Sequence, residues 1–369
     1  MFILKGRDDV GTKEMNEVYW LRIIACLSVV LTHAVSRVIT DFSLSGDIRV
    51  VYRTLQMLLL YGTPMFVLIS TIVMTHAYKE KIPNGFLIKR IKYILVPYLV
   101  MATFYAGHKY IRFDWTFKDF AIELGFNFIG QWHGYFVLII FQFYLLHLLF
   151  IKYLKRFKPM HVLIVSFLIS AGYWMGFYFF FIDFVQHSSY LTLFFSRILI
   201  FGWLFYYVVA YYCGRNYEMF INKLHRYWLV VVLGTIVSMG LVQFIYHSGM
   251  LMRVTSARFD MIPYTVMLFF LFFLLFSKLN RIPTWIVSIS GYSYGIYLLH
   301  PFVQTMVRSW FPLLETTPFG YMIVQFIAGV IVPIIFIYLL SKFHLGAFIV
   351  GKTTTRKKVF RETALSKVA

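Results

Sequence analysis

The spacing of apolar residues constrains this fold more than any other feature of the sequence. Apolar runs of about 20 residues follow one another along the chain, and a helix of that length crosses the hydrocarbon core of a bilayer. Ten such runs cover residues 18–38, 52–76, 91–110, 132–152, 160–182, 194–213, 227–247, 261–277, 284–307 and 319–341. Because lipid offers backbone groups no hydrogen bonds, we expect an all-α integral membrane protein with about ten transmembrane helices.

The composition excludes a soluble globular enzyme, a disordered chain and a disulfide-stapled module. Of the 369 residues, 60% are hydrophobic and 14% are charged. A soluble domain carries about 25% charged residues. The net charge of +20 would suggest nucleic acid in a soluble protein. In a membrane protein, basic loops beside anionic lipid explain a positive net charge. We therefore expect the lipid bilayer as a partner and no nucleic acid.

The charges of the connecting segments predict the topology. If both termini are cytoplasmic, the inner segments hold 24 of the 35 Lys and Arg residues and the outer segments hold 9. This asymmetry follows the positive-inside rule. The predicted organisation is a cytoplasmic N-terminal segment (1–17), a ten-helix membrane domain (18–341) and a basic cytoplasmic tail (342–369). The outer loop 111–131 is expected to contain a short amphipathic helix at the membrane surface.

Arg22 and His33 are two ionisable residues of the first span. Their separation of eleven residues places them within about 20° of each other around a helix and about 16 Å apart along its axis. Ionisable groups inside a membrane are costly, so both are candidate functional residues. The competing interpretation is that Arg22 extends to lipid phosphate and that His33 bonds a neighbouring carbonyl.

Carboxylates are absent from the deep parts of the predicted spans. We expect the outer-loop residues Asp41, Asp114, Asp119 and Asp260 to be solvated. A carboxylate dyad or a carboxylate proton relay is therefore not expected. No metal site is expected either, because no close histidine pair at helical spacing has a carboxylate beside it.

Three motifs carry a resemblance to a known family. They are Arg22 and His33 in the first span, the segment GFLIKRIKYILVPY (85–98) before the third span, and SGYSYGIYLLHP (290–301) in the ninth. In this order they resemble the acyltransferase 3 family of integral membrane O-acyltransferases. The family has arginines in the basic segment, where this chain has Arg90 and Lys92.

Further stretches, at 61–70, 128–144 and 201–207, resemble the intercellular-adhesion C type within that family, from poly-N-acetylglucosamine systems. This resemblance implies a multi-pass protein of the bacterial plasma membrane that acts on a biofilm polysaccharide. It also implies a polysaccharide synthase complex as a candidate partner.

The family resemblance implies that cytoplasmic acyl-CoA is a co-substrate and that no cofactor is tightly bound. The candidate groups for its diphosphate are Arg22, Lys89, Arg90 and Lys92, because cations bind phosphate strongly. The lysines and Arg90 would alternatively only set the topology.

Two histidines are the candidate catalytic residues. His33 would act as general base towards an acceptor hydroxyl, or would itself carry the acyl group. His300 is the second candidate, since it lies as deep in the ninth span as His33 does in the first. Alternatively, His300 and Pro301 mark a helix break whose free carbonyls the histidine caps.

Aromatic and polar residues at the outer ends of spans are candidates to bind the acceptor: Gln131, Trp132, His133, Tyr135 and Arg197. Sugar rings stack on aromatic faces, and sugar hydroxyls need polar partners. The competing interpretation of Trp132 is an ordinary interfacial aromatic belt.

The expected reaction moves an acyl group, acetyl or succinyl, from acyl-CoA to a hydroxyl of a cell-surface or lipid-linked polysaccharide. This is an acyltransferase activity on groups other than amino-acyl groups. One alternative is an exporter or flippase of a surface polysaccharide such as poly-N-acetylglucosamine. Another is a membrane scaffold for a glycan synthase, which would not need Arg22 or His33.

Overall fold

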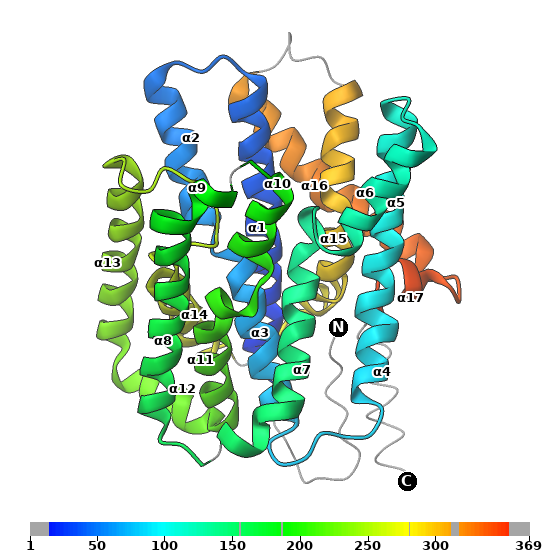
Figure 1. The fold of residues 1–369 in the computed structure, drawn as a ribbon. Coiled ribbons are helices and arrows are strands. Elements are labelled where there is room, and N and C mark those ends of the chain that lie inside the picture. The colour runs from blue at the N-terminus through cyan, green and yellow to red at the C-terminus, as the bar shows by residue number, and fades with distance from the viewer. Residues whose placement is uncertain (1–14, 155, 186, 280, 311–316, 354–369) are drawn as a thin grey trace. The chain divides into compact units, whose positions relative to one another are not determined.

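The computed structural model describes residues 15–154, 156–185, 187–279, 281–310 and 317–353. Most of the predicted N-terminal segment and the tail beyond residue 353 lie outside this part of the chain. Within it every regular element is a helix (Figure 1). The elements are α1 (Glu17–Asp41), α2 (Gly46–Leu59), α3 (Gly62–Ala77), α4 (Phe86–Arg90), η1 (Ile91–Leu95), α5 (Val96–Arg112), α6 (Phe117–Phe128), η2 (His133–Tyr135), α7 (Phe136–Leu154), α8 (Pro159–Gly176), η3 (Phe177–Phe181), α9 (Ile182–Val185), α10 (Ser189–Leu193), η4 (Phe194–Ile198), η5 (Ile200–Trp203), α11 (Leu204–Arg215), α12 (Tyr217–Arg226), α13 (Trp228–His247), α14 (Met261–Phe276), α15 (Thr284–Trp310), α16 (Pro318–Leu340) and α17 (Gly346–Ile349).

The prediction of an all-helical membrane protein is confirmed, and helices occupy all ten predicted positions. Seven stretches of the described chain are long and apolar enough to cross a bilayer: Glu17–Asp41, Gly46–Ala77, Phe117–Phe150, Pro159–Val185, Tyr190–Arg215, Trp228–His247 and Pro318–Leu340. The other three positions hold α5, α14 and α15. α14 has 16 residues, and α15 has 27 residues that include many polar ones. The number ten and the sides of the termini therefore stay predictions.

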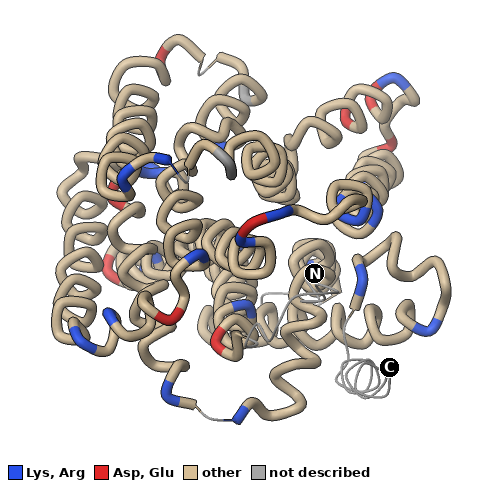
Figure 2. The backbone as a smooth tube through the Cα atoms, turned by 90° about the horizontal axis from the view of Figure 1, so that it is seen from below, with Lys and Arg blue, Asp and Glu red and all other residues tan. Residues whose placement is uncertain are grey.

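The chain forms two compact units. The first contains Met1–Phe66, Ile221–Ser256 and Pro263–Ala369. The second contains Val67–Phe220 and Ala257–Ile262. Lys, Arg, Asp and Glu colour only a small part of the trace in Figure 2, as expected for a chain with 14% charged residues.

The first unit is built on α1, α15 and α16, which pack against one another (Figure 1). A glycine on α16 permits the close approach, because a Cβ at Gly329 would lie 2.9 Å from Val30 Cγ1. Small residues play this part in many membrane helix pairs. Gln304 Nε2 of α15 donates to the Val30 carbonyl over 3.1 Å, which ties α15 to α1 at the same level.

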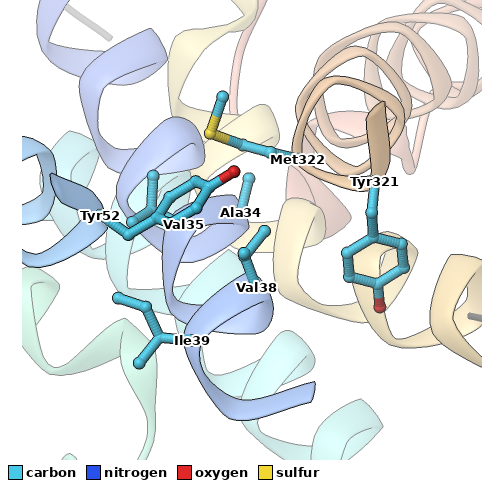
Figure 3. Packing of buried hydrophobic residues seen from close by; sticks show 7 residues of the cluster. All are labelled: Ala34, Val35, Val38, Ile39, Tyr52, Tyr321 and Met322. Carbon is cyan, nitrogen blue, oxygen red and sulfur yellow. The ribbon is translucent and has the colours of Figure 1, made fainter. Parts of the chain in front are cut away.

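The C-terminal half of α1 packs in an apolar cluster (Figure 3). α1 contributes four side chains to it, and α2 and α16 pack against them. The cluster consists of Ala34, Val35, Val38, Ile39, Tyr52, Tyr321 and Met322. Its residues on α1 recur every three or four positions, which is the spacing of one helix face.

The second unit contains α4 to α11. The helices α5 and α6 form a hairpin in which Asn127 Nδ2 donates to the Ala102 carbonyl over 3.1 Å. α6 lies where the sequence predicts a short amphipathic helix, and a capping box at Thr116 and Asp119 begins it. α8 and α11 are joined through Ser170, whose hydroxyl oxygen accepts a hydrogen bond from the Phe205 N–H over 3.0 Å.

Candidate active site

The helices α1 and α15 pack side by side in a constant register. At four successive levels a residue of α1 contacts the residue 267 or 268 positions later on α15. The four pairs are Cys26 with Ser293, His33 with His300, Arg37 with Thr305, and Asp41 with Arg308. Both helices therefore run in the same direction along one shared polar seam, which we call the α1–α15 seam.

His33 and His300 face each other in the α1–α15 seam. Their ring centroids are 5.1 Å apart and the ring planes are inclined by 61°. His300 is fully buried, whereas His33 is partly exposed. The expectation that the two histidines lie at similar depth is thus confirmed.

The hydrogen bond of His300 fixes its tautomer. Nδ1 lies 3.0 Å from the Ile296 carbonyl oxygen, and a carbonyl only accepts, so Nδ1 carries the hydrogen. In the neutral ring the lone pair is then on Nε2, which is the atom able to take a proton.

The predicted alternative of a helix break at Pro301 is wrong. α15 continues through Pro301 to Trp310. Proline lacks an N–H, so the carbonyl deprived of its usual partner is that of Tyr297, four residues earlier. The imidazole of His300 bonds the Ile296 carbonyl instead. The histidine therefore does not cap the carbonyl that Pro301 leaves without its helical donor.

Arg22 lies in the interior of the first unit and is 8% exposed. Simple extension into lipid does not account for that burial. On α1 it shares a face with Cys26, whose Sγ is 3.6 Å from the Ser293 carbonyl on α15. The shared face of Arg22 and His33 therefore turns towards α15. Cys26 lies between Arg22 and His33 on this face.

The predicted phosphate-binding residues of the second unit do not all point the same way. Arg90 is partly buried, and its guanidinium carbon lies 4.6 Å from the Phe86 ring centroid and 5.6 Å from that of Tyr144. Lys89 and Lys92 are exposed. The π-helical turn η1 follows Arg90 directly, and such turns often mark functional sites.

Four aromatic rings of the second unit form one cluster around Trp132. The ring centroids of Tyr98 and Tyr105 each lie 5.2 Å from Trp132, and that of His133 lies 4.7 Å away. Gly134 makes room for the indole, because a Cβ there would overlap the Trp132 ring. Trp132 and His133 are partly exposed, so the cluster keeps accessible ring surface.

Arg197 and Tyr135 are brought together in the same unit. The Arg197 guanidinium carbon lies 5.7 Å from the Tyr135 ring centroid. The sixth predicted span lies within a stretch long and apolar enough to cross a bilayer, Tyr190–Arg215, but its helix is interrupted at Leu199, which is extended between η4 and η5. Trp203 Nε1 donates to the Arg197 carbonyl over 2.7 Å and so satisfies one group that the break exposes. Gln131 precedes the Trp132 cluster and is partly exposed.

The solvated state expected for Asp41 and Asp260 is wrong. The Asp41 side chain is 0% exposed and pairs with Arg308 over 2.9 Å. Asp260 pairs with Arg258 over 2.6 Å, and both side chains are 0% exposed. Buried carboxylates require such partners. For Asp41 the sequence gives no signal of its partner, because Arg308 lies 267 positions away on another helix. Asp114 and Asp119 are exposed, as expected.

Sequence reasoning also missed buried polar residues on other helices. Gln304 and Gln325 are at most 1% exposed, and His147 is fully buried with its Nδ1 2.9 Å from the Tyr207 hydroxyl. Such residues could have been found as single polar residues within apolar runs, for example in the run 142–151. Among the described residues, no three His, Cys, Asp or Glu side chains gather as a metal site would need.

Comparison with known families gives a match to the acyltransferase domain of the acyltransferase 3 type over residues 15–342. A Bacillus subtilis protein, YfiQ, is 36% identical over 347 residues, which cover 92% of this chain and 95% of the relative. Its name provisionally calls it a membrane-bound acyltransferase.

Relatives from staphylococci carry a different name. A Staphylococcus aureus protein is 30% identical over 346 residues, covering 91% of this chain and 95% of the relative. A Staphylococcus epidermidis protein is 28% identical over 350 residues, covering 92% and 95%. Both are provisionally named poly-beta-1,6-N-acetyl-D-glucosamine export proteins. No solved structure matches the chain.

Proposed function

Because this chain belongs to the acyltransferase 3 family, we propose that it is a membrane-bound O-acyltransferase. The donor is cytoplasmic acyl-CoA carrying acetyl or succinyl. The acceptor is a hydroxyl of a cell-surface or lipid-linked polysaccharide in the bacterial plasma membrane. The observation that carries this proposal is the His33–His300 pair, which joins the first-span and ninth-span motifs at a ring distance of 5.1 Å.

The proposed chemistry needs one proton shuttle. An imidazole nitrogen of the pair removes the proton of the acceptor hydroxyl while the oxygen attacks the thioester carbonyl. The tetrahedral intermediate collapses and breaks the carbon–sulfur bond. The imidazolium returns its proton to the leaving CoA thiolate, so the pair ends the cycle unchanged. The fixed tautomer of His300 supports a role for its Nε2 in this shuttle.

A covalent variant of the reaction uses the same pair. An imidazole nitrogen of His33 attacks the thioester carbonyl, the carbon–sulfur bond breaks, and the CoA thiolate takes the ring N–H proton as it leaves. The acceptor hydroxyl then attacks the acyl-imidazole, the carbon–nitrogen bond breaks, and the hydroxyl proton passes to the freed imidazole. Transient acylation of His33 without acceptor would separate this route from general-base catalysis.

The proposal assigns the acyl-CoA donor and the sugar acceptor to different groups of residues. Arg22 is the donor-side cation of the first unit, where its burial supports a role beyond topology. Arg90 is the favoured cation of the second unit, ahead of the exposed Lys89 and Lys92. The Trp132 cluster, with Gln131, Tyr135 and Arg197, is the proposed surface for sugar rings, since four rings gather there.

The test is transfer of radiolabelled acetyl or succinyl from CoA by the purified full chain in lipid nanodiscs. The acceptor panel contains β-1,6-linked N-acetylglucosamine oligomers, free and lipid-linked, and other surface glycans. We expect labelled ester with the wild type and none with His33→Ala. The control His161→Ala changes an exposed histidine of α8 and keeps full activity. Equal transfer by wild type and His33→Ala would overturn the proposal.

Export of a polysaccharide is the second candidate, because the staphylococcal relatives carry that name. The two functions differ in a deletion strain. A transferase predicts normal amounts of surface polymer that lack the ester group. An exporter predicts polymer held inside the cell. A scaffold for a synthase would need neither Arg22 nor His33.

A further inference from the structure

The α1–α15 seam continues beyond the histidine pair with two charged levels. Arg37 lies one turn after His33 on α1, and its Nη2 donates to Thr305 Oγ1 over 2.8 Å. One turn further, Arg308 Nη2 lies 2.9 Å from Asp41 Oδ1. Both levels are on the side of the histidine pair away from Arg22. Two arginines thus stand on the opposite side from the proposed donor cation.

Asp41 holds Arg308 in a defined place. The Asp41 side chain is 0% exposed, and its Oδ2 also accepts a hydrogen bond from the Tyr321 hydroxyl over 3.0 Å. The Arg308 side chain is 44% exposed. A guanidinium carries five N–H donors in a planar fork that matches phosphate and carboxylate. Arg308 is therefore anchored at one edge while the rest of its fork remains accessible.

The neighbouring helix α2 adds positive charge. Arg53 Nη1 donates to Gln56 Oε1 over 2.8 Å, and Gln56 Nε2 in turn donates to Ser36 Oγ on α1. Over the described ends of α1, α2 and α15, positive charges exceed negative ones by two. The charged residues there are Arg37, Arg49, Arg53 and Arg308 against Asp41 and Asp47.

This excess lies where topology alone does not favour it. In the proposed topology these helix ends are extracellular, and outer segments are normally poor in Arg and Lys. Two of the arginines are oriented by partners on another helix, Arg37 by Thr305 and Arg308 by Asp41. An oriented group of guanidinium ions is suited to an anion that carries several oxygens.

We propose that the ends of α1 and α15 form an anion-binding subsite in which Arg37 and Arg308 hold a phosphate group borne by the acceptor. The inference rests on the proposed function, because only that function gives this side of the seam an acceptor. The acceptor would then be a glycan in which phosphate joins the sugar to a lipid or to the next sugar unit. A phospholipid headgroup offers the same chemistry, so the experiment separates these two sources.

The test compares two matched glycolipids with the full chain in phosphatidylcholine nanodiscs. One carries a disaccharide joined to a prenyl chain through a diphosphate, and the other joins the same parts without phosphate. Binding is measured by native mass spectrometry. We expect the phosphate-bearing glycolipid to bind the wild type at least about tenfold more tightly, as charge-assisted hydrogen bonds would give.

Variants locate the effect. Arg37→Gln keeps a donor for Thr305 but removes the charge, and should abolish most of the preference. Arg37→Lys keeps the charge and should retain part of the preference. Arg226→Gln neutralises an exposed arginine at the end of α12 in the same unit and should leave the preference intact. The single variant Arg308→Gln is not used, because it would leave the buried Asp41 without its cation. The charge of Arg308 is instead removed in the double variant Asp41→Asn with Arg308→Gln.

Three results would overturn the inference. They are equal binding of the two glycolipids, an unchanged preference in Arg37→Gln, and full competition by phosphatidylglycerol added to the nanodiscs. The last result would assign the subsite to lipid headgroups. Binding does not depend on transfer, so selective binding without acylation of any acceptor would overturn the proposed function and leave this subsite standing.

Discussion

Two buried histidine sites in this protein differ in what surrounds the imidazole. In the first unit, His300 bonds a backbone carbonyl and faces a second imidazole, that of His33. In the second unit, His147 Nδ1 lies 2.9 Å from the Tyr207 hydroxyl oxygen, and the ring centroids of His147 and Tyr211 are 6.2 Å apart. Both His147 and His300 are fully buried. Burial alone therefore does not mark a catalytic histidine.

The partners explain the difference. A tyrosine hydroxyl pairs with Nδ1 of His147 and ties α7 to α11, which is a structural use of a polar side chain. A carbonyl fixes the tautomer of His300, and the partly exposed ring of His33 gives the pair a route to substrate. Arg22 and Arg37 lie on the same helix as His33. We therefore expect catalysis to depend on the first site and stability to depend on the second.

The largest expected effect is that of His33→Ala. Loss of a general acid–base group lowers the rate by about a hundredfold to ten thousandfold. Mass analysis of surface glycan from wild-type and variant strains checks this, with protein abundance measured in the same membranes. If surface glycan from the variant strain carries the normal amount of ester, His33 is not catalytic, and the two histidine sites do not differ in function.

His300→Ala is expected to reduce turnover by about ten- to a hundredfold, because the pair loses one imidazole while His33 remains. The KM for acyl-CoA should change little, since Arg22 is untouched. Initial rates over a range of acyl-CoA concentrations measure both constants. A variant with raised KM and unchanged turnover would assign His300 to donor binding instead.

Arg22→Gln tests whether the first site extends along α1. We expect the KM for acyl-CoA to rise about tenfold, because one charge-assisted contact to phosphate is lost. Turnover at saturating acyl-CoA should stay close to the wild-type value. The matched control Arg226→Gln removes an exposed cation of the same unit. Equal changes in both variants would reduce the role of Arg22 to general electrostatics.

The smallest effect on activity is expected for His147→Phe. Transfer should stay within about twofold of the wild type, while the Tyr207 hydroxyl loses its partner and stability falls by about 1–3 kcal/mol. Thermal unfolding in detergent measures the loss, and His147→Phe with Tyr207→Phe should recover part of it. Strong loss of transfer in a well-folded variant would make the second site functional too.

Sequence predicted those parts of the molecule that depend on local pattern. Apolar runs located the helices, and helical spacing placed Arg22 and His33 on one face. The equal depth of His33 and His300 followed from the direction of their spans, and the structure confirms it.

The rest depends on contacts between distant segments. Asp41 looked like a loop carboxylate because its partner Arg308 lies on another helix. The interruption at Leu199 follows a π-helical turn that apolar periodicity does not reveal. Helix register sets these contacts, and packing of whole helix surfaces determines that register.

The most direct test of the account is a structure of the full chain with a non-reactive thioether analogue of acyl-CoA. We predict that the acyl carbonyl lies within about 6 Å of an imidazole nitrogen of the His33–His300 pair, which leaves room for one acceptor hydroxyl between them in general-base catalysis. An acyl group bound away from both histidines, with the pair packed closed against α16, would contradict the account.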